Sequence, residues 1–571
     1  MSTLPYPNTP KNPRHSPRRR RHPTGLAALA LAAATLAGCT TNPAAGATAQ
    51  AAEQHTENQP PRGGVIEYGH LQEPNCLYGG WTQEAFTSRQ VLDSLVSQTD
   101  EGEIVPWLAT DWEVSDDGLV WTFQLLEDIA FTDGTALDAE AVAYNFEYWV
   151  NGGNGTSLAN IGGFYEDAKA VDEHTVEVAL SARYNTFLSA LSQSYFGIQS
   201  PTALESRSDA ENCREPIGSG PFTVEEWKRG EHIEFARNDN YDSAPQNARH
   251  QGPAYVDGIK WRFIPENTSR FGSLSSGESD AIGEVPAVNV EEAEEHYEYE
   301  QYIMPGRPIV INLNTERGVF SDVGVRQALS YATDREANIE SAFLGTVPEE
   351  LNAHMSRSTP MYDDGAAEAY PFDLDEADRL LDDAGWTGRD EGGTRTKDGA
   401  RLEAKVVYGL NSIITPDGNT AIQNFQEQAR SAGFDLTLRP MTQSEMFGGT
   451  FATPETRDAY IGSWTSSHPG ILNIAYRPGT TDNPNGANQT FLADEEPYEV
   501  IQRALQAGSD SEARDLFSQA QHELNELAPA IGLYDHTNSL AVSDSVEGIW
   551  LEASQGGPVF HDAHFVTEQE D

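Results

Sequence analysis

Aromatic side chains in loops rich in glycine, proline and asparagine are the residues of this sequence best suited to binding a small molecule. One loop contains Tyr78 and Trp81, and another contains Trp464 and His468 and leads to Tyr476. Aromatic walls with a few polar groups are typical of ligand pockets. Any one of these aromatic side chains is more typical of a core anchor at a loop base, but several such loops together favour a pocket. We expect these five residues to line it.

Motifs for catalysis do not accompany these loops. The sequence has no GxSxG nucleophile elbow, no HExxH motif and no CxxC or HxxxH spacing, which are patterns of common hydrolases and zinc sites. The glycine-rich segment 218–220 lacks the Lys-Ser/Thr ending of a phosphate-binding loop. We therefore expect a protein without catalytic activity, cofactor or metal. A secreted hydrolase is the alternative from a different class.

The charge of the chain excludes one class of partner. The sequence has 89 acidic and 36 basic residues, which gives a net charge of −53. Because binding to phosphates needs clustered lysine and arginine, nucleic acid is not an expected partner. The acidic residues are spread along the chain, which indicates a strongly solvated surface.

The N-terminus reads as an export signal. Basic residues at 18–21 precede an uncharged apolar run at 26–36, which is the order of a secretory signal. The run is shorter than the roughly 20 residues that span a bilayer. Cys39 directly follows two small residues and resembles the cysteine of a bacterial lipoprotein box, which implies a lipid anchor on the extracytoplasmic face of the cell membrane. A plain signal peptide and an uncleaved anchor are the alternatives.

Only two cysteines follow Cys39. If the chain is exported, Cys76 and Cys213 lie in an environment that permits disulfides. We expect them to pair and to close a long loop. Two isolated thiols are the alternative.

The hydrophobic periodicity of the sequence predicts the strands and helices that position these loops. Alternating apolar residues predict strands at 119–125 and 259–263, and a helix is expected at 138–150. Farther along, a strand at 402–406, a helix ending at Gly433 and a strand at 434–438 form a βαβ unit, which implies parallel pairing. The pattern predicts an α/β fold with two strand-rich regions.

Five sequence blocks, in order, resemble family 5 of the extracellular solute-binding proteins, the peptide/nickel/oligopeptide-binding group of ABC importers. The blocks span residues 106–125, 217–222, 264–280, 322–335 and 370–386. The resemblance implies a two-lobed, periplasmic-binding-protein-like (type II) α/β fold with a hinge. The implied segments are a signal peptide at 1–38, a tether at 39–61, lobe I at 62–306 with an extra subdomain at about 76–212, lobe II at 307–535, and a return to lobe I at 536–571.

The resemblance also implies a function. Members of the family capture a solute between the lobes, and closure presents the complex to a membrane permease. We therefore expect a monomeric receptor that delivers a peptide or peptide-like solute to an ABC permease. A receptor that signals through a membrane partner is a further alternative.

One departure from the family pattern concerns the solute. Peptide-binding members resemble Gly-Trp-x-Ala-Asp-Tyr-Pro-Asp-Pro in a lobe II loop, whose first Asp pairs with the peptide amine. That position is Ser467 here, and a neutral hydroxyl is a poor partner for a buried ammonium. His468 beside it favours the alternative of a metal chelate or an opine-type ligand. We expect Arg307 and Asn488 as polar contacts, with Arg307 either holding a carboxylate or lying on the hinge surface.

Overall fold

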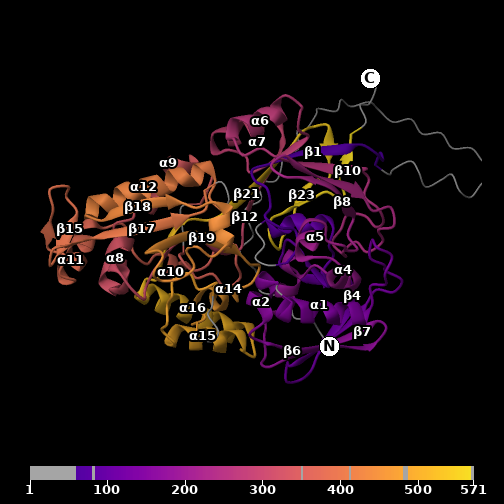
Figure 1. Cartoon of the computed structure of the whole chain (residues 1–571), viewed down its shortest axis with the longest axis horizontal. Helices are drawn as coiled ribbons and strands as arrows, with labels where there is room; N and C mark the ends of the chain where they lie inside the picture. Colours follow the sequence, from indigo (N-terminus) through magenta and orange to yellow (C-terminus); the bar gives the residue numbers. More distant parts are fainter. Residues whose placement is uncertain are drawn as a thin grey trace, which may run out of the picture.

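The computed structural model describes residues 60–79, 84–152, 154–348, 352–410, 413–479 and 486–566. These residues form two lobes that lie side by side (Figure 1). The predicted signal peptide, Cys39 and Trp81 lie outside the described residues. Within the described residues, no helix combines the length and apolar character needed to cross a membrane.

Lobe I is built on a seven-stranded sheet with the order β12-β21-β11-β1-β10-β9-β8. Its strands are β1 (Val65–His70), β8 (Phe222–Lys228), β9 (His232–Arg237), β10 (Gly258–Phe263), β11 (Ala281–Gly283), β12 (Glu298–Ile303) and β21 (Thr537–Val542). The central strand β1 runs parallel to β10 and β11. The predicted strand at 259–263 is confirmed, with Ile259 and Trp261 fully buried.

A second layer of lobe I is a four-stranded antiparallel sheet with the order β4-β5-β7-β6. It consists of β4 (Ala109–Val114), β5 (Val120–Leu125), β6 (Tyr165–Asp172) and β7 (Thr175–Leu180), and it is covered by α1 (Ala139–Asn151). The helix predicted at 138–150 is confirmed by α1. The Asp138 side chain caps this helix by accepting a hydrogen bond from the backbone N–H of Ala141. Cys76 and Cys213 are disulfide-bonded, with their Cα atoms 4.9 Å apart.

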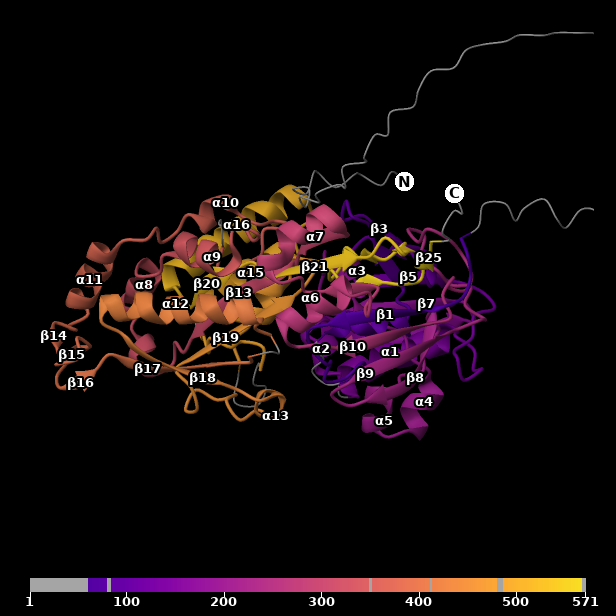
Figure 2. The same ribbon diagram turned by 90° about the horizontal axis from the view of Figure 1, so that it is seen from above.

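Lobe II is built on a five-stranded sheet with the order β18-β17-β19-β13-β20, in which β13 is Gly306–Leu313, β19 is Ala459–Thr465 and β20 is Ala530–Tyr534. The predicted βαβ unit is confirmed as β17 (Glu403–Tyr408), α12 (Pro416–Ala432) and β18 (Asp435–Pro440), with β17 and β18 parallel. Gly433 ends α12 with φ 99°, a left-handed conformation that glycine adopts without strain. Helices α8 (Val323–Tyr331), α9 (Arg335–Phe343) and α12 lie on one side of the sheet (Figure 2).

The chain passes between the lobes twice. It leaves the lobe I sheet after β12 and enters the lobe II sheet at β13 (Gly306–Leu313). It leaves lobe II after β20 (Ala530–Tyr534) and returns to lobe I at β21. Two short neighbouring connections of this kind are a geometry that permits hinge motion.

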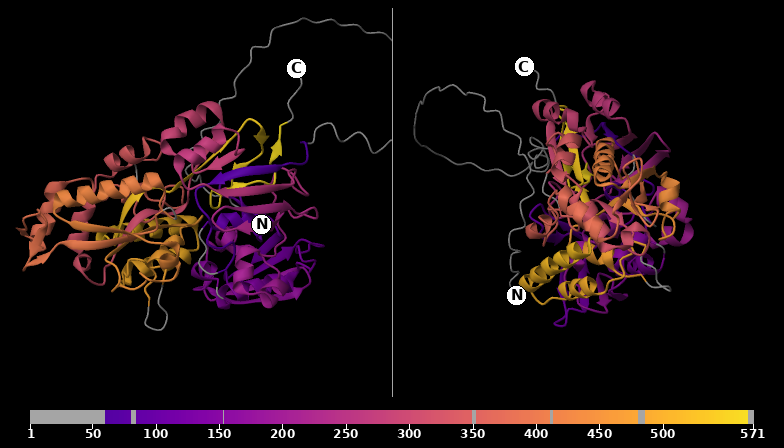
Figure 3. Two further views of the ribbon diagram at one scale, coloured as in Figure 1. Left: turned by 45° about the horizontal axis from the view of Figure 1, so that its top comes forward. Right: turned by 90° about the vertical axis from the view of Figure 1, so that its left-hand side faces the viewer.

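Helices of lobe II also contact the second layer of lobe I. Asn185 donates from its backbone N–H to Leu505 O and from Nδ2 to Ala504 O, at 3.0 and 2.9 Å. Ser467 Oγ donates to Ser189 O at 3.0 Å. The helices concerned are α14 (Ile471–Tyr476), α15 (Glu496–Leu505) and α16 (Asp510–Leu527), of which α15 and α16 are the gold helices beside the purple layer (Figure 3). The two lobes are therefore in direct contact at these helices as well as at the two crossings of the chain.

The remaining helices complete the two lobes. In lobe I they are η1 (Ala85–Gln90), α2 (Gly155–Ile161), α3 (Phe187–Leu191), η2 (Ser194–Phe196), α4 (Pro201–Ser206), α5 (Asp209–Arg214), α6 (Asn267–Ser275), η3 (Ala287–Asn289) and α7 (Val290–His296). In lobe II they are η4 (Val319–Ser321), α10 (Asp364–Ala367), α11 (Leu374–Asp383) and α13 (Gln443–Phe447). Short strands are β2 (Val96–Gln98), β3 (Ile104–Pro106), β14 (Gly388–Arg389), β15 (Arg395–Lys397), β16 (Ala400–Arg401), β22 (Val546–Glu547), β23 (Trp550–Leu551), β24 (Pro558–Val559) and β25 (His564–Phe565).

Candidate functional site

A cavity of about 340 Å³ lies between the lobes. This volume is within the range of small-molecule sites. Residues of both lobes line it: Glu84, Phe86, Thr156, Tyr195, Glu284, His536, Asn538 and Gln555 from lobe I, and Met441, Met446, Phe451, Arg457, Tyr460, Ser463, Trp464 and Gln489 from lobe II. A molecule held there contacts both lobes at once.

The lobe II wall is rich in aromatic rings and sulfur. Tyr460 and Trp464 come from β19 (Ala459–Thr465) and line the cavity with Phe451. Residues four apart on a strand share one face, so both side chains reach the same space. Met441 and Met446 lie beside them, and methionine side chains adapt to irregular apolar groups. This wall suits an apolar or aromatic part of a ligand.

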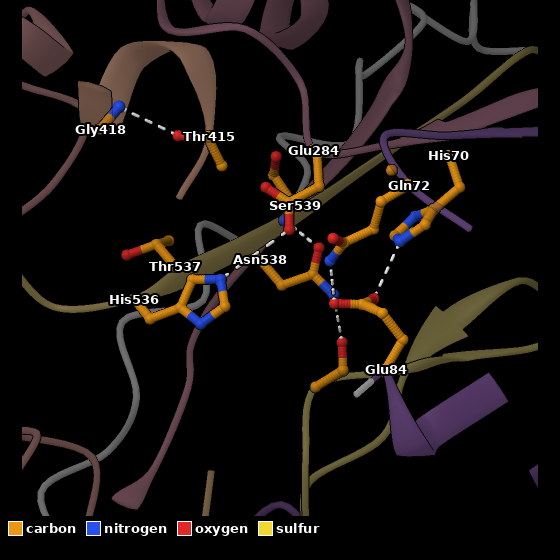
Figure 4. A network of polar contacts seen from close by, with 12 residues as sticks. His70, Gln72, Glu84, Glu284, Thr415, Gly418, His536, Thr537, Asn538 and Ser539 are labelled. Carbon is orange, nitrogen blue, oxygen red and sulfur yellow. Dashed lines mark hydrogen bonds and ion pairs between the residues drawn. The ribbon is translucent and has the colours of Figure 1, made fainter. Parts of the chain in front are cut away.

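The lobe I wall presents two carboxylates, those of Glu84 and Glu284. Their φ angles are 56° and 53°, in the left-handed region that residues other than glycine rarely adopt. Glu84 accepts a hydrogen bond from His70 Nε2 at 2.9 Å and another from Gln72, which fixes its carboxylate (Figure 4). The backbone and these two partners position negative charge at the cavity.

The carboxylate of Glu284 has fewer polar partners than that of Glu84. Among the described residues, His536 Nε2 is the nearest basic atom recorded for its carboxylate, at 4.0 Å. Burial raises the pKa of Glu284 from 4.5 to about 7 and lowers the pKa of His536. A ligand cation placed here would favour the ionised form of Glu284 and lower its pKa again.

Arg457 is the cation of the lobe II wall. It is 4% exposed, and its guanidinium lies over the rings of Tyr460 and Phe491, 4.9 Å from each centroid. Arg457 Nη2 donates a hydrogen bond to Gln489 O at 3.0 Å, and no carboxylate of the described residues forms an ion pair with Arg457. Burial lowers its pKa to about 10. By contrast, the buried Arg395 is paired at 2.6 Å with Asp378 and Asp382.

The chain has 53 more acidic than basic residues, yet Arg457 forms no ion pair with a carboxylate of the described residues, so its guanidinium can pair with the carboxylate of a ligand. The two walls therefore differ in the charge that they offer to a ligand in a largely apolar cavity. Lobe I contributes Glu84 and Glu284. Lobe II contributes Arg457 together with Glu445, whose carboxylate is already paired with Arg439 at 2.6 Å. Such a cavity complements a molecule that carries an amine and a carboxylate on an apolar body.

Of the residues expected to line a pocket, the structure brings Trp464 to this cavity. Tyr78 lies elsewhere, in the core of lobe I. Its hydroxyl donates to Asn145 Oδ1 at 3.2 Å and accepts from Trp149 Nε1 at 2.9 Å. Tyr78 does not line the cavity between the lobes, because its hydroxyl anchors its loop on α1. Trp81 lies outside the described residues.

Arg307 and Tyr476 lie next to the cavity and bind each other. Arg307 Nη2 donates to the Tyr476 hydroxyl at 2.8 Å, and Nη1 donates to Asn312 Oδ1 at 2.6 Å. His354 Nδ1 is 2.7 Å from the same hydroxyl. Arg307 is 5% exposed, so the hinge-surface interpretation is wrong. It borders a space of about 20 Å³ that shares Trp464 with the main cavity.

His468 and Asn488 have structural environments outside the main cavity. His468 is 1% exposed, and its Nδ1 accepts from the Gly470 N–H at 3.1 Å. Burial lowers its pKa to about 3. Asn488 Nδ2 donates to the backbone carbonyls of Arg477 and Leu492. The loop that holds His468 packs on Tyr184 and Ser189 of lobe I, and Asn488 bonds to the backbone of its own loop, so neither side chain lines the main cavity.

Sequence reasoning missed Glu84, Glu284 and Arg457. With 89 acidic residues in the chain, no spacing distinguishes these two glutamates from the others. Arg457 precedes the aromatic strand β19, and that position is the one sequence signal that could have drawn attention to it.

Comparisons with known proteins give a consistent result. A family model described as bacterial extracellular solute-binding proteins, family 5 Middle, matches residues 103–486. The nickel-binding periplasmic protein of Escherichia coli (strain K12) is 25% identical over 476 residues, 80% of this chain and 84% of that protein. The oligopeptide-binding protein AppA of Bacillus subtilis (strain 168) is 24% identical over 546 residues, 92% and 95% of the two chains.

Solved structures show the same architecture. AppA from Bacillus subtilis in complex with a nonapeptide aligns with a TM-score of 0.76 at 20% identity, covering 89% of this chain and all of that one. NikA from Brucella suis in complex with Fe(III)-EDTA aligns with a TM-score of 0.73 at 24% identity, covering 88% and 100%. These likenesses confirm the predicted two-lobed α/β fold of periplasmic binding proteins.

Proposed function

The chain belongs to family 5 of the bacterial extracellular solute-binding proteins, and we propose that it captures a peptide-like solute between its lobes for an ABC permease. The observation that carries the proposal is the cavity itself, with Glu84 and Glu284 on lobe I, and with Arg457 and the rings of Tyr460 and Trp464 on lobe II. This arrangement fits a short zwitterion better than a purely apolar or purely anionic solute.

The division of charge between the lobes couples binding to closure. A solute whose amine contacts Glu284 and whose carboxylate contacts Arg457 makes both contacts only when the lobes are together. The solute therefore favours the closed state by the free energy of the second contact. A permease that recognises the closed form would receive loaded receptors in preference to empty ones.

The cavity also offers a replacement for the aspartate missing at Ser467. Ser467 is buried and its hydroxyl bonds to lobe I, so it is not available to an amine in the cavity. Glu284 and Glu84 supply the negative charge from the opposite lobe. The amine of the solute would thus be bound by lobe I in this protein.

A metal chelate or opine-type solute is the second candidate. The observation in its favour is His536, an imidazole that lines the cavity beside Glu284. Relatives include proteins named for nickel binding. The two carboxylates and the imidazole would then contact the chelate or its metal.

The organisation of the chain enters the proposal as well. The lobes correspond to residues 62–306 with a subdomain at about 76–212, 307–535, and 536–571. Residues 1–38 would be removed as a signal peptide, Cys39 would carry the lipid, and 39–61 would act as the tether. The monomer, anchored on the extracytoplasmic face, would bind solute without chemical change.

Native mass spectrometry of the purified protein tests the proposal by identifying solute that copurifies with it. Thermal-shift titration with short peptides follows, with N-acetylated and C-amidated forms of the same peptides as controls. Ligand at about 100 times its Kd stabilises the folded state by about 2.7 kcal/mol. Stabilisation by free peptides, and weaker stabilisation by both blocked forms, supports the zwitterion. Stabilisation by nickel or iron chelates and by no peptide would favour the second candidate, and hydrolysis of the peptides would refute a pure receptor.

A further inference from the structure

A group of three metal-ligand side chains lies on lobe I, outside the cavity between the lobes. His250, His561 and Asp562 each offer one ligand atom, and these atoms lie within 4.8 Å of one another. His250 Nδ1 is 2.8 Å from Asp562 Oδ1, and His561 Nδ1 is 3.7 Å from the same oxygen. His561 is 4% exposed and Asp562 is 3% exposed. Segments more than 300 residues apart in the sequence therefore place two imidazoles against one buried carboxylate.

The hydrogen bonds around the rings orient their free nitrogens. His561 Nε2 is 2.8 Å from Gly252 O, and His250 Nε2 is 3.3 Å from Pro253 O. A carbonyl oxygen only accepts, so each Nε2 carries the hydrogen when these bonds form. Without a metal ion, His250 Nδ1 donates a hydrogen bond to Asp562 Oδ1 at 2.8 Å, and a bound ion would take the place of that proton. His561 Nδ1 already presents its lone pair on the side of Asp562. Once His250 Nδ1 releases its proton, three ligand atoms surround one point, and a cation placed among them compensates the buried negative charge.

The carboxylate is oriented by a further contact. Trp550 Nε1 donates to Asp562 Oδ2 at 3.0 Å, which leaves Oδ1 directed at the imidazoles. Ligating histidines that donate their second nitrogen to backbone carbonyls, next to a hydrogen-bonded carboxylate, are the usual surroundings of a protein metal site.

The site has room to complete a coordination shell. A space of about 50 Å³ borders His561 and Asp562. Because a water molecule needs roughly 10–15 Å³ of such volume, the space has room for at least one. The two imidazole rings are stacked, with centroids 4.0 Å apart and planes 6° apart. Binding of one ion by both Nδ1 atoms requires the ring of His561 to tilt, and the adjoining space permits that tilt.

We propose that His250 Nδ1, His561 Nδ1 and Asp562 Oδ1 bind a divalent transition-metal ion of the Zn²⁺ or Ni²⁺ class, with water in the open position. Two imidazoles and one carboxylate favour these ions over Mg²⁺ and Ca²⁺, which prefer all-oxygen sites. The ion would tie the C-terminal segment to the loop at 250–253. Its role would thus be structural, and the inference is independent of the solute proposed for the cavity.

Calorimetric titration of the metal-stripped full chain with ZnCl₂ and with NiCl₂ tests the site. We expect one site that weakens at least about tenfold in H250Q and in H561Q, with the change in Tm on adding metal lost in parallel. H232Q is the matched control, because His232 lies between Glu226 and Glu234 in the other group of this kind. This control variant should bind the metal ion as the wild type does.

Long-range ¹H–¹⁵N NMR of the imidazoles gives a readout that does not depend on a variant folding. Added Zn²⁺ should shift the Nδ1 resonances of His250 and His561 and leave the Nε2 hydrogens in place. The proposal is overturned if His250 keeps an Nδ1–H bond to Asp562 in millimolar Zn²⁺. It is overturned equally if the metal affinity of the two histidine variants matches that of the wild type.

Discussion

Replacing Glu284 with glutamine is expected to change the stability of the unliganded protein in a pH-dependent way. The side chain is 15% exposed, and burial raises its pKa from 4.5 to about 7. Glutamine keeps the shape of the side chain and removes the charge that burial disfavours. E284Q should therefore be more stable than the wild type wherever the wild-type carboxyl is ionised in the unfolded chain.

The size and sign of the effect follow from the two pKa values. One pKa unit corresponds to 1.36 kcal/mol, so the shift of Glu284 amounts to at most about 3 kcal/mol, less what residual solvent contact screens. Between pH 4.5 and 7 the folded state holds a proton that the unfolded state has released, so wild-type stability falls as pH rises through this interval. Below pH 4.5 both states are protonated and the penalty is absent. Above pH 7 the penalty is complete.

Urea midpoints of wild type and E284Q, measured from pH 4 to 9, test this reasoning. The difference should be small at pH 4, grow up to pH 7 and then stay constant. E291Q is the control, since Glu291 is exposed on the same lobe. A difference between E284Q and wild type that does not change with pH would refute the burial argument, as would an equal response of E291Q.

Three further outcomes are expected. R457Q should weaken the binding of a peptide with a free carboxylate by roughly 10- to 100-fold, because a hydrogen bond to a charged group contributes about 1.5–3 kcal/mol. Calorimetry should show no loss of affinity for the amidated peptide in R457Q, and none for either peptide in the exposed control R379Q. The double substitution C76S/C213S should lower the free energy of unfolding by about 2–5 kcal/mol in chemical denaturation, and an unchanged midpoint would contradict this. F425A should cost about 3–5 kcal/mol by the same method, since Phe425 is fully buried in lobe II.

The elements of the fold were largely accessible from local sequence. The alternation at 402–406 and 434–438, with a helix ending at Gly433 between them, predicted β17, α12 and β18. Asp138 predicted the start of α1 through its capping side chain. These features depend on neighbours within a few residues, so periodicity and capping chemistry suffice to identify them.

The site was accessible only in part. Trp464 was predicted to line a pocket and does so, whereas Tyr78, His468 and Asn488 form hydrogen bonds within the body of the protein. An aromatic or polar residue in a glycine-rich loop has the same local sequence whether it faces a cavity or anchors the loop. Burial decides between these outcomes, and burial depends on distant segments.

By itself, the sequence determined the α/β class, the family and the order of the segments, since these depend on local patterns repeated along the chain. Tertiary structure alone decided which charges face one another. Glu84, Glu284 and Arg457 meet around one cavity although up to 373 residues separate them, and the lobes that carry them are joined by two crossings of the chain. Charge complementarity across a cleft depends on distances in space, and no spacing in the sequence encodes those distances.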